Sequence, residues 1–458
     1  MHTALLVADR LFDGRAFREG TVRVDVAGGK IAAITPFTGD PPPEALDVRG
    51  ATLLPGFVDA HCHAARVGLF EPDETPNPAA VVANLAGALA RGVTTLGDMG
   101  CTAPMARALR KASEANASVP AVRSSGPVLA DPLGYPLDWM QPMHKRLGAV
   151  IAVADEKSAK DAVGRVAAAG MDHVKMCIMH QSYAYKPLSV FSQSTARAIV
   201  EEAHALGLRA FAHAHSDADY RLALDAGASA LMHSAFDPLS EETVARVRDA
   251  GIPVCATMWV FHSACLGAEE RWDRDPARAR GVTRPVRRSW KRWAEAYAAS
   301  GDVIPPGIAG GLDKARAKEG PRIAAANLKL LADARVPIAH GSDGPYGFSL
   351  LGCPRDELGA LHSAGLDVEA CLRAATSVGA DLLAARDRGR LEPGARADLV
   401  VLDGDPRRDL DALARVRFVM RGGEIVRDGL RARAHLAAAV ARGFAATLAS
   451  AVARSSRP

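Results

Sequence analysis

The sequence lacks several features that would assign it to a specialised class of protein. Its 458 residues include seven scattered cysteines and no CxxC pair, which argues against a disulfide framework and favours a reducing compartment. There is no Lys- and Arg-rich run interleaved with aromatics, and the net charge of +4 is mild, so a nucleic-acid partner is not expected. The apolar run at residues 4–7 is too short for a signal peptide or a membrane span. The sequence therefore predicts a cytoplasmic protein that binds neither nucleic acid nor membrane.

With 48% hydrophobic residues, the chain is long enough for one large domain and a smaller one. Residues 1–55 show short apolar runs broken by turn residues, and residues 390–430 return to the same texture. We expect these two flanks to form one small split β-sandwich domain, which would keep the two ends of the larger domain together. The alanine-rich stretch 431–458 is expected to be a helical C-terminal tail, either an oligomer contact or a frayed end.

Between the flanks, residues 56–389 alternate apolar strand patterns with amphipathic helix patterns. Eight strands alternating with helices over this length are typical of an α/β fold, the parallel (β/α)8 TIM barrel. The predicted strands end near His63, Asp98, Gly126, Lys175, His213, His233, Thr257 and Asp343. The predicted helices are 78–91, 103–117, 157–169, 194–206, 217–226 and 241–250.

One stretch, at about residues 262–320, is too long for a single strand–helix unit. It follows the seventh predicted strand, carries Trp272, Trp290 and Trp293, and is broken by glycine and proline residues at 305–311. An insertion there would lie over the C-terminal ends of the strands, where the active sites of such barrels form. It is therefore a candidate lid, with Trp290 and Trp293 as candidate substrate-binding residues. The alternative is that these tryptophans only pack the insertion against the barrel.

The first predicted strand of the barrel ends in two histidines, His61 and His63. Residues i and i+2 of a strand point to the same face, so the two imidazoles lie side by side. Imidazole is the commonest nitrogen ligand of zinc, and such a pair forms half of a metal site. Alone, such a pattern is more often structural than metal-binding.

Four further strands end in Lys175, His213, His233 and Asp343. The two histidines could be buried and bonded to the backbone, and Asp343 could be a turn or helix-cap residue. Lys175 is harder to explain in this way, because an unpaired ammonium group on an apolar strand is costly and must be neutralised, paired or modified. Six such residues on five strand ends indicate one common site.

Five segments resemble signatures of the amidohydrolase superfamily. They are PGFVDAHCH at 55–63, GVTTLGD at 92–98, AHAH at 212–215, HGSD at 340–343 and GRLEPGARADLVV at 389–401. The resemblance spans nearly the whole chain and implies a binuclear metal centre. His61 and His63 would hold the buried metal. His213 and His233 would hold the exposed metal, and a carboxylated Lys175 would bridge the two. The implied cofactors are two divalent ions, with Zn2+ the first choice, and CO2 for carboxylation of the lysine.

The resemblance also implies a mechanism. Two divalent ions lower the pKa of a shared water, so that a bridging hydroxide exists near neutral pH and attacks a polarised carbonyl. Asp343 would bind a metal, accept the proton of the hydroxide and carry it to the leaving amine. Lys175 and Asp343 are therefore the candidate catalytic residues.

Residues after the strand ends bear on the substrate. His215 stands where many cyclic-amide hydrolases of the superfamily carry a glutamate. Together with Lys175, it resembles the branch of imidazolonepropionase-like proteins, dipeptidases, N-acyl-amino-acid hydrolases and ochratoxin-type amidases. The segment 177–183 lacks the glycine-rich turn often found in that branch, which leaves the substrate group open. His215 and Tyr135 are candidate substrate-binding residues, although Tyr135 could equally be a turn residue.

The sequence thus predicts a metal-dependent hydrolase that cleaves an exocyclic amide, carbamate or urea C–N bond. The expected substrates are small N-acyl amino acids, dipeptide-like compounds or aryl amides, and the expected assembly is a homo-oligomer. The alternatives are a deaminase of an amino-heterocycle or a cyclic-amide or lactone hydrolase, and Lys175 and the missing glutamate disfavour the deaminase. A non-catalytic interaction protein is a remote alternative, because all six ligand positions are filled.

Overall fold

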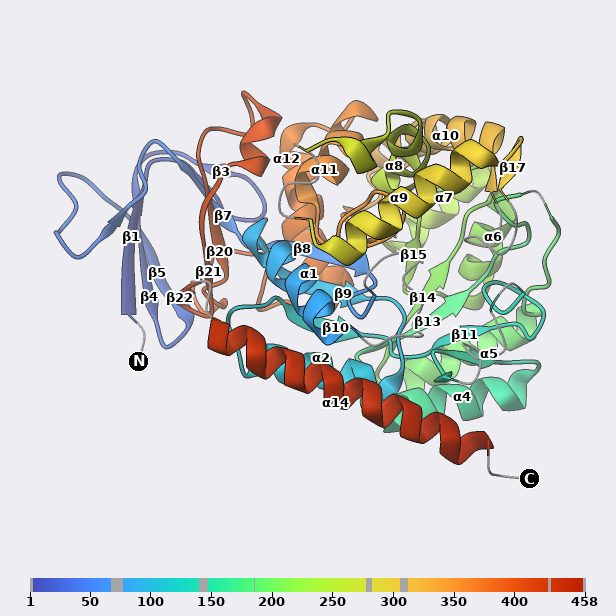
Figure 1. Ribbon diagram of the computed structural model, residues 1–458. Helices are drawn as coiled ribbons and strands as arrows, with labels where there is room; N and C mark the ends of the chain where they lie inside the picture. The colour runs from blue at the N-terminus through green and yellow to red at the C-terminus, as the bar shows by residue number, and fades with distance from the viewer. Residues whose placement is uncertain are drawn as a thin grey trace.

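The computed structural model describes residues 3–66, 77–138, 140, 147–184, 186–276, 282–304, 312–426 and 430–455. Figure 1 shows small sheets at one end of the molecule, beside a larger body in which helices cover parallel strands. The glycine and proline residues at 305–311, predicted to break the insertion, lie outside the described residues.

The chain flanks form two sheets, and the second sheet combines both ends of the chain. In that sheet β20 runs antiparallel to β7, with Leu399 opposite Pro55. The two sheets share one apolar core, in which Leu6 and Val401 are fully buried. The first sheet has the order β5-β4-β1-β6, formed by Lys30–Pro36, Val22–Ala27, Thr3–Ala8 and Leu46–Asp47. The second has the order β22-β21-β20-β7-β2-β3, formed by Glu424–Ile425, Val416–Arg421, Leu399–Leu402, Thr52–Pro55, Leu11–Phe12 and Phe17–Arg18.

The larger body is an α/β structure with two sheets of parallel strands. Backbone hydrogen bonds connect the two sheets on both sides: Ala60 N donates to His340 O at 2.9 Å, and Asp172 N donates to Ser124 O at 2.9 Å. The smaller sheet has the order β10-β9-β8, formed by Ala121–Ser124, Val93–Asp98 and Phe57–Cys62. The larger has the order β12-β11-β13-β14-β15-β16-β19, formed by Val150–Ala152, Val128–Ala130, His173–Cys177, Arg209–His213, Ala230–Met232, Val254–Cys255 and Ile338–Ala339.

Two of these strands, β11 and β12, are missing from the sequence-based prediction. Each has only three residues, which is too short to give a period-two pattern. β11 pairs with β13, and β12 pairs with the other side of β11. The segment that carries Tyr135 therefore directly follows β11, a strand of the larger sheet.

The six predicted helices are confirmed, with ends that differ by at most three residues. Local capping explains their limits. For example, the Ser216 side chain accepts a hydrogen bond from Asp219 N at 3.1 Å at the start of α6, and Gly227 ends the helix at a φ of +81°. The helices around the strands are α1 Pro78–Ala90, α2 Ala103–Glu114, α4 Glu156–Ala168, α5 Gln193–Ala205, α6 Asp217–Ala226, α7 Glu241–Ala250, α10 Lys314–Asp333, α11 Pro354–Ser363, α12 Val368–Arg373 and α13 Gly379–Leu382. A π-helical turn, Ala374–Val378, and a 3-10 turn, Leu410–Ala414, complete the set.

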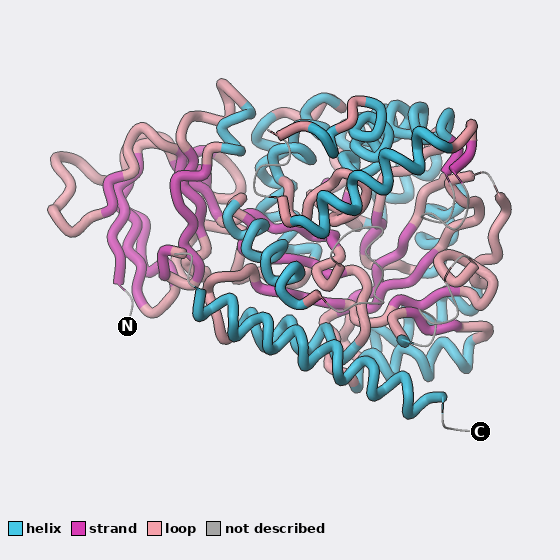
Figure 2. The backbone as a smooth tube through the Cα atoms, in the orientation of Figure 1, coloured by secondary structure: helices cyan, strands magenta, loops and turns pink. Residues whose placement is uncertain are grey.

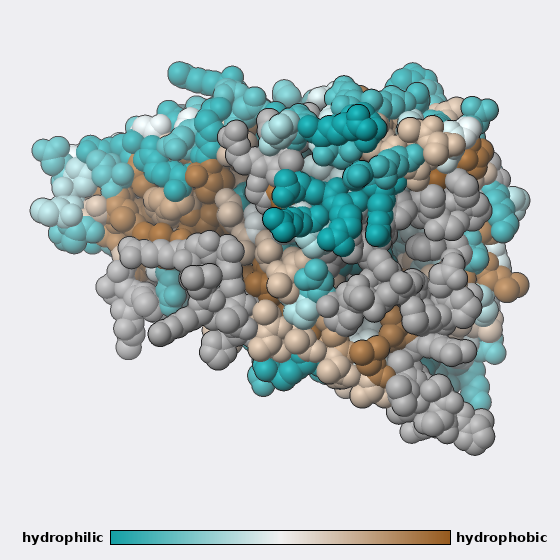
Figure 3. Space-filling model, in the orientation of Figure 1, coloured by the Kyte–Doolittle hydropathy of each residue, from teal (hydrophilic) through white to brown (hydrophobic). Residues whose placement is uncertain are grey.

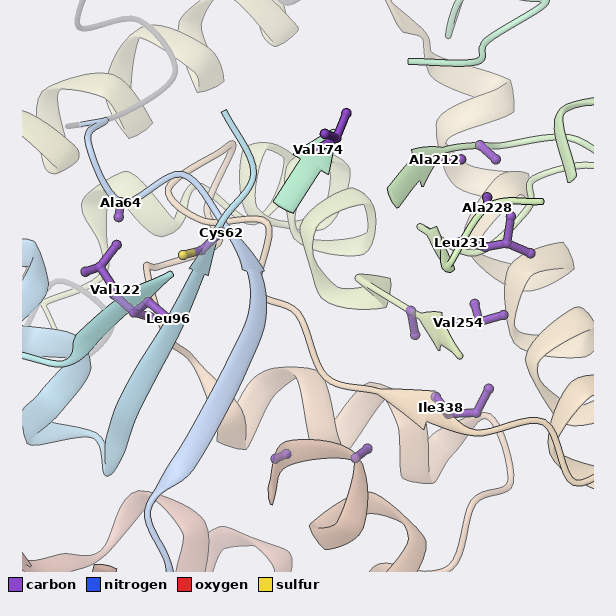
Figure 4. Packing of buried hydrophobic residues seen from close by; sticks show 14 of the residues in the cluster. Cys62, Ala64, Leu96, Val122, Val174, Ala212, Ala228, Leu231, Val254 and Ile338 are labelled. Atoms are coloured by element: carbon purple, nitrogen blue, oxygen red, sulfur yellow. The ribbon is translucent and has the colours of Figure 1, made fainter. Parts of the chain in front are cut away.

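Strand side chains alternate between two buried environments, as the period of two requires. On β14, Ala212 belongs to the cluster that includes the surrounding helices, whereas Phe211 packs in an inner cluster with Met232 and Ala339. Figure 4 shows members of the outer cluster, among them Val254 on β16. Both faces of the parallel strands are filled by apolar side chains, so the reactive groups predicted from the sequence meet at the strand ends.

The predicted insertion forms α8 Met258–Glu269, a 3-10 turn Trp272–Arg274, α9 Arg284–Ala299 and the paired strands β17 Val303–Ile304 and β18 Leu312–Asp313. α9 is amphipathic, with Trp290 and Trp293 on its buried face. Its outer face is hydrophilic in Figure 3. Thr283 Oγ1, at the start of α9, donates to Asn84 of α1 at 3.3 Å, while Asp313 N donates to Tyr183 O at 3.0 Å. The insertion thus connects the helix after the first barrel strand with the loop after β13.

The C-terminal helix α14, Leu430–Ser455, lies along α2 and α1 (Figures 1 and 2). Val440 is fully buried, and Thr447 Oγ1 is 2.6 Å from Thr102 Oγ1. The frayed-end alternative is therefore wrong for this part of the helix, while an oligomer contact stays a prediction.

Candidate metal centre

The six predicted ligands are brought to the same end of the parallel strands. They are His61 on β8, His63 just after it, Lys175 on β13, His213 at the end of β14, His233 after β15 and Asp343 after β19.

Asp343 lies among the histidines. Its Oδ1 atom is 3.4 Å from His61 Nε2 and 3.1 Å from His63 Nε2, and its Oδ2 atom is 3.9 Å from His233 Nδ1. The ring centroid of His233 lies 4.5 Å from that of His61 and 4.4 Å from that of His213. Side chains from four strand ends therefore converge within contact distance of one another.

Lys175 is the unusual member of the cluster. Its side chain is buried, and its Nζ atom has no hydrogen-bond partner among the described residues. Burial lowers the pKa of Lys175 to about 8, opposed by Cys177 and Asp343. A fraction of the amine is therefore neutral near pH 8, which is the form that reacts with CO2.

His61, His213 and His233 are in the protonation state that binds metals. Burial lowers the pKa of His61, His213 and His233 well below the ordinary value, and the positive charge of Lys175 lowers all three further. Their imidazoles are therefore neutral at neutral pH, with a lone pair available to a cation. Lys175 is therefore close enough to all three rings for its charge to act on them.

This donor set fits divalent cations. Ligand atoms lie within 4.8 Å of one another in two groups of three, His61 with His233 and Asp343, and His213 with His215 and His233. Within the described ranges, the buried atoms His61 Nδ1 and His213 Nε2 lack hydrogen-bond partners. Such atoms are costly unless something satisfies them. Imidazole and carboxylate are the ligand types that zinc and similar ions take.

The backbone at the site adopts unusual conformations. His233 has a φ of +80°, Thr257 of +47° and Asp343 of +46°, in the left-handed region that residues other than glycine rarely adopt. Strain of this kind persists where surrounding structure enforces it, and it clusters at functional sites.

The HGSD turn is held against β8. A Cβ atom added to Gly341 would lie 2.7 Å from His61 Cβ and 2.6 Å from Cys255 Sγ, so only glycine fits there. The buried Asp59 accepts hydrogen bonds from Ser342 N and Gly352 N, at 2.9 and 3.2 Å. Sequence reasoning did not single out Asp59 as a support, although a carboxylate within an apolar strand is a signal that could have found it.

Tyr183 is a second residue that the sequence analysis missed. Its hydroxyl is 2.8 Å from His215 Nε2, and its ring lies 5.2 Å from that of Phe261. Tyr135 stacks on His213, with ring centroids 4.8 Å apart and an angle of 22° between the rings. The predicted substrate-binding residues His215 and Tyr135 thus form, with Tyr183, an aromatic wall beside the predicted metal ligands.

Trp290 and Trp293 lie in the core of the insertion, 3% and 2% exposed. Trp293 Nε1 donates to Ala264 O at 2.7 Å, whereas Trp290 Nε1 has no partner in the part of the chain that the structure describes. Trp290 packs on Phe348, which follows the Asp343 turn, at 5.2 Å between ring centroids. Their role in substrate binding stays a prediction.

A parallel α/β body with a buried cluster of neutral imidazoles at its strand ends is typical of metal-dependent enzymes. Residues 52–426 match the model of the Amidohydrolase family, and the chain belongs to that family. It is thus a hydrolytic enzyme that acts on small molecules. No helix in the described ranges has both the length and the apolar character needed to cross a membrane.

Solved structures show the same fold. A Xaa-Pro dipeptidase with bound methionine in its active site superposes with a TM-score of 0.73 at 21% identity, over 93% of this chain and 100% of the other. An ochratoxinase of A. niger gives 0.70 at 19% identity, over 92% and 96%. Molinate hydrolase gives 0.69 at 16% identity, over 93% and 95%. A search of curated proteins found no match.

Proposed function

We propose that this protein is a binuclear metal-dependent hydrolase that cleaves an exocyclic amide, carbamate or urea C–N bond in a small substrate. The observation that carries the proposal is the buried Lys175, whose Nζ atom lacks a partner among the described residues and whose charge lowers the pKa of His61 and His213. An ammonium group there repels cations, whereas its carboxylated form is an anion that two cations would share. Carboxylation adds CO2 to the neutral amine and releases one proton.

In this proposal His61 and His63 would hold one ion, His213 and His233 would hold the other, and carboxylated Lys175 would serve both. Zn2+ is the proposed metal, because the ligands are mostly imidazoles. When bound, two divalent ions would lower the pKa of a water molecule and polarise a carbonyl oxygen.

Asp343 is the proposed proton carrier. It lies within 3.4 Å of both His61 and His63, so its carboxylate faces the space between the ligands. It would accept a proton from the attacking water and donate it to the leaving nitrogen, which then departs as a neutral amine. Without that proton the leaving group would be a poor, strongly basic amide anion.

The aromatic wall is the proposed substrate side of the site. Tyr135 and His215, with Tyr183, would contact the acyl or aryl part of the substrate, and the insertion with Trp290 and Trp293 would cover it. The dipeptidase and the ochratoxinase of similar fold support N-acyl amino acids, dipeptide-like compounds and aryl amides as the first substrates to test.

The remaining parts of the proposal concern the fold, the domains and the assembly. We infer that the parallel strands close into a (β/α)8 barrel over residues 56–389, supported by the hydrogen bonds of Ala60 and Asp172 between the two sheets. The flanks 1–55 and 390–430 would then be one split β-sandwich domain, followed by the helical tail at 431–458. A cytoplasmic homo-oligomer is the proposed assembly.

A substrate screen with product identification tests the function. Enzyme expressed with bicarbonate and loaded with Zn2+ is incubated with N-acyl amino acids, dipeptides, carbamates, phenylureas and amino-heterocycles. We expect release of an amine from at least one member of the first four groups, and no release by Asp343→Asn. Ammonia from amino-heterocycles, with no C–N cleavage in the other groups, would establish the deaminase alternative.

A further inference from the structure

Helix α8 begins beside the metal centre without a cap of its own. Its N-cap residue is Thr257, and a threonine in that position ordinarily adopts an extended backbone and accepts an N–H bond of the helix. Here the backbone of Thr257 is in the left-handed region, with φ +47° and ψ +44°. Within the described residues, its hydroxyl accepts no hydrogen bond from an N–H group of the helix. The first N–H groups of α8 must therefore find acceptors elsewhere.

Glu357 of α11 supplies those acceptors. One oxygen of its carboxylate accepts from Met258 N at 2.8 Å and the other from Trp259 N at 2.7 Å. The side chain is fully buried, and burial raises its pKa to about 8, while the hydrogen bonds from Trp259 N and Met258 N lower it. The positive end of the α8 dipole favours the ionised carboxylate as well. Glu357 thus replaces the capping side chain that Thr257 does not provide.

The replacement leaves the Thr257 hydroxyl available to the site, where Oγ1 lies 2.8 Å from His233 Nδ1. When Nδ1–H donates the hydrogen bond and the threonine oxygen accepts it, the lone pair of the imidazole is left on Nε2. Partners of this kind fix the tautomer and orientation of histidines that bind metals. The left-handed conformation of Thr257 is what turns its hydroxyl from its own helix to the histidine.

We propose that Glu357 is a positioning residue of the metal centre, which acts through Thr257 on His233. It caps α8 in place of Thr257, so that the threonine hydroxyl can hold His233 with Nε2 directed to the metal. This inference rests on the proposed function, because His233 matters in this way only if it is a metal ligand.

The test measures the affinity of the protein for Zn2+ by competition with a chromogenic chelator. The variants are Glu357→Gln, Thr257→Val, Thr257→Ser and the double variant Glu357→Gln/Thr257→Val. Glutamine retains one acceptor and places an N–H donor against the other N–H group of α8. Val163→Ala, in the core of α4, is the control that loses stability far from the site.

We expect Glu357→Gln and Thr257→Val each to weaken the binding of one of the two zinc ions by about 10- to 100-fold. Thr257→Ser and Val163→Ala should bind zinc as the wild type does. The double variant should bind no more weakly than Thr257→Val, because both changes remove the same contact.

A Glu357→Gln protein that melts at a lower temperature but binds both ions normally would show that Glu357 is only a helix cap. If Glu357→Gln does not fold, normal zinc affinity in Thr257→Val overturns the inference. A double variant with additive losses would also overturn it. A wild-type protein that binds no zinc would instead remove the proposed function, so the two failures are distinguishable.

Discussion

The strand ends and the insertion differ in how their buried polar groups are satisfied. In the insertion, Trp293 Nε1 donates to Ala264 O and Tyr297 Oη donates to Glu269, both at 2.7 Å. At the strand ends, Lys175 Nζ and His213 Nε2 are buried without partners among the described residues. Because native proteins rarely leave buried polar groups unpaired, the strand ends are organised for something that is not part of the chain.

This difference separates residues that stabilise the fold from residues that we propose to carry the chemistry. Both regions are rich in large or polar side chains, so composition alone does not distinguish them. Trp290 is the exception in the insertion, because its indole N–H lacks a partner in the described ranges. In this respect Trp290 resembles Lys175 and His213, the buried residues at the strand ends.

The largest expected effect comes from Lys175→Ala. Loss of the bridging anion should remove much of the metal and several kcal/mol of transition-state stabilisation, about 1,000-fold in kcat/KM. Short-chain carboxylic acids should restore part of the activity, because they supply an anion in the space vacated. Lys175→Arg should be inactive and not rescued, since guanidinium stays charged.

Lys314 at the base of the insertion is the matched control, because its Nζ donates to Tyr297 O and Ser300 O at 2.7 Å. Lys314→Ala should lower stability by about 1–3 kcal/mol and keep its metal. Full activity and full metal content in Lys175→Ala would end the bridging proposal and revive the deaminase alternative.

Asp343→Asn should keep much of its metal and lose about 100-fold or more in kcat, because a carboxamide cannot carry the proton to the leaving amine. Metal analysis and steady-state kinetics on the same preparation measure both properties. Wild-type turnover in this variant would exclude Asp343 as the proton carrier.

The sequence alone predicts those parts of the candidate site that depend on a local sequence pattern. His61, His213 and Asp343 each follow an apolar strand pattern. Because parallel strands of a barrel end at the same side, we could expect these side chains to meet there. Contacts between distant segments could not be foreseen. Tyr183 is 32 residues from His215, and Glu357 is 99 residues from Met258, and nothing in either local pattern encodes the partner.

The same limit applies to the fold. Helices such as α6 are predictable because their caps and apolar faces lie within about ten residues. β11 is stabilised by its neighbours in the sheet, of which β13 lies more than forty residues further along the chain. Its three residues carry no signal of that pairing.

The pKa of Lys175 predicts a pH dependence for activation. Carboxylation uses the neutral amine, and the fraction of that form rises as the pH passes through the pKa of about 8. At constant dissolved CO2, the rate at which metal-free enzyme is activated by CO2 and Zn2+ should rise about tenfold from pH 7 to pH 9 and then level off. A rate independent of pH would contradict this assignment, and Lys175→Ala should show no response to CO2.

The smallest effects are expected in the two insertion tryptophans. Trp293→Phe removes the N–H group that donates to Ala264 O, which should cost about 1–3 kcal/mol of stability with normal kinetics. Trp290→Phe removes an N–H with no bond to lose, so its melting temperature should fall less and its KM should rise several-fold if Trp290 binds substrate. Thermal melts and kinetics of the two variants distinguish these outcomes, and unchanged KM in Trp290→Phe would assign both indoles to packing.

The measurement that tests the central claim most directly is the metal content of wild-type enzyme expressed with bicarbonate, determined by elemental analysis against protein concentration. The account predicts about two divalent ions per chain, held by ligands from five strand ends. An active, freshly purified enzyme with one tightly bound ion or none would contradict a binuclear centre built around Lys175.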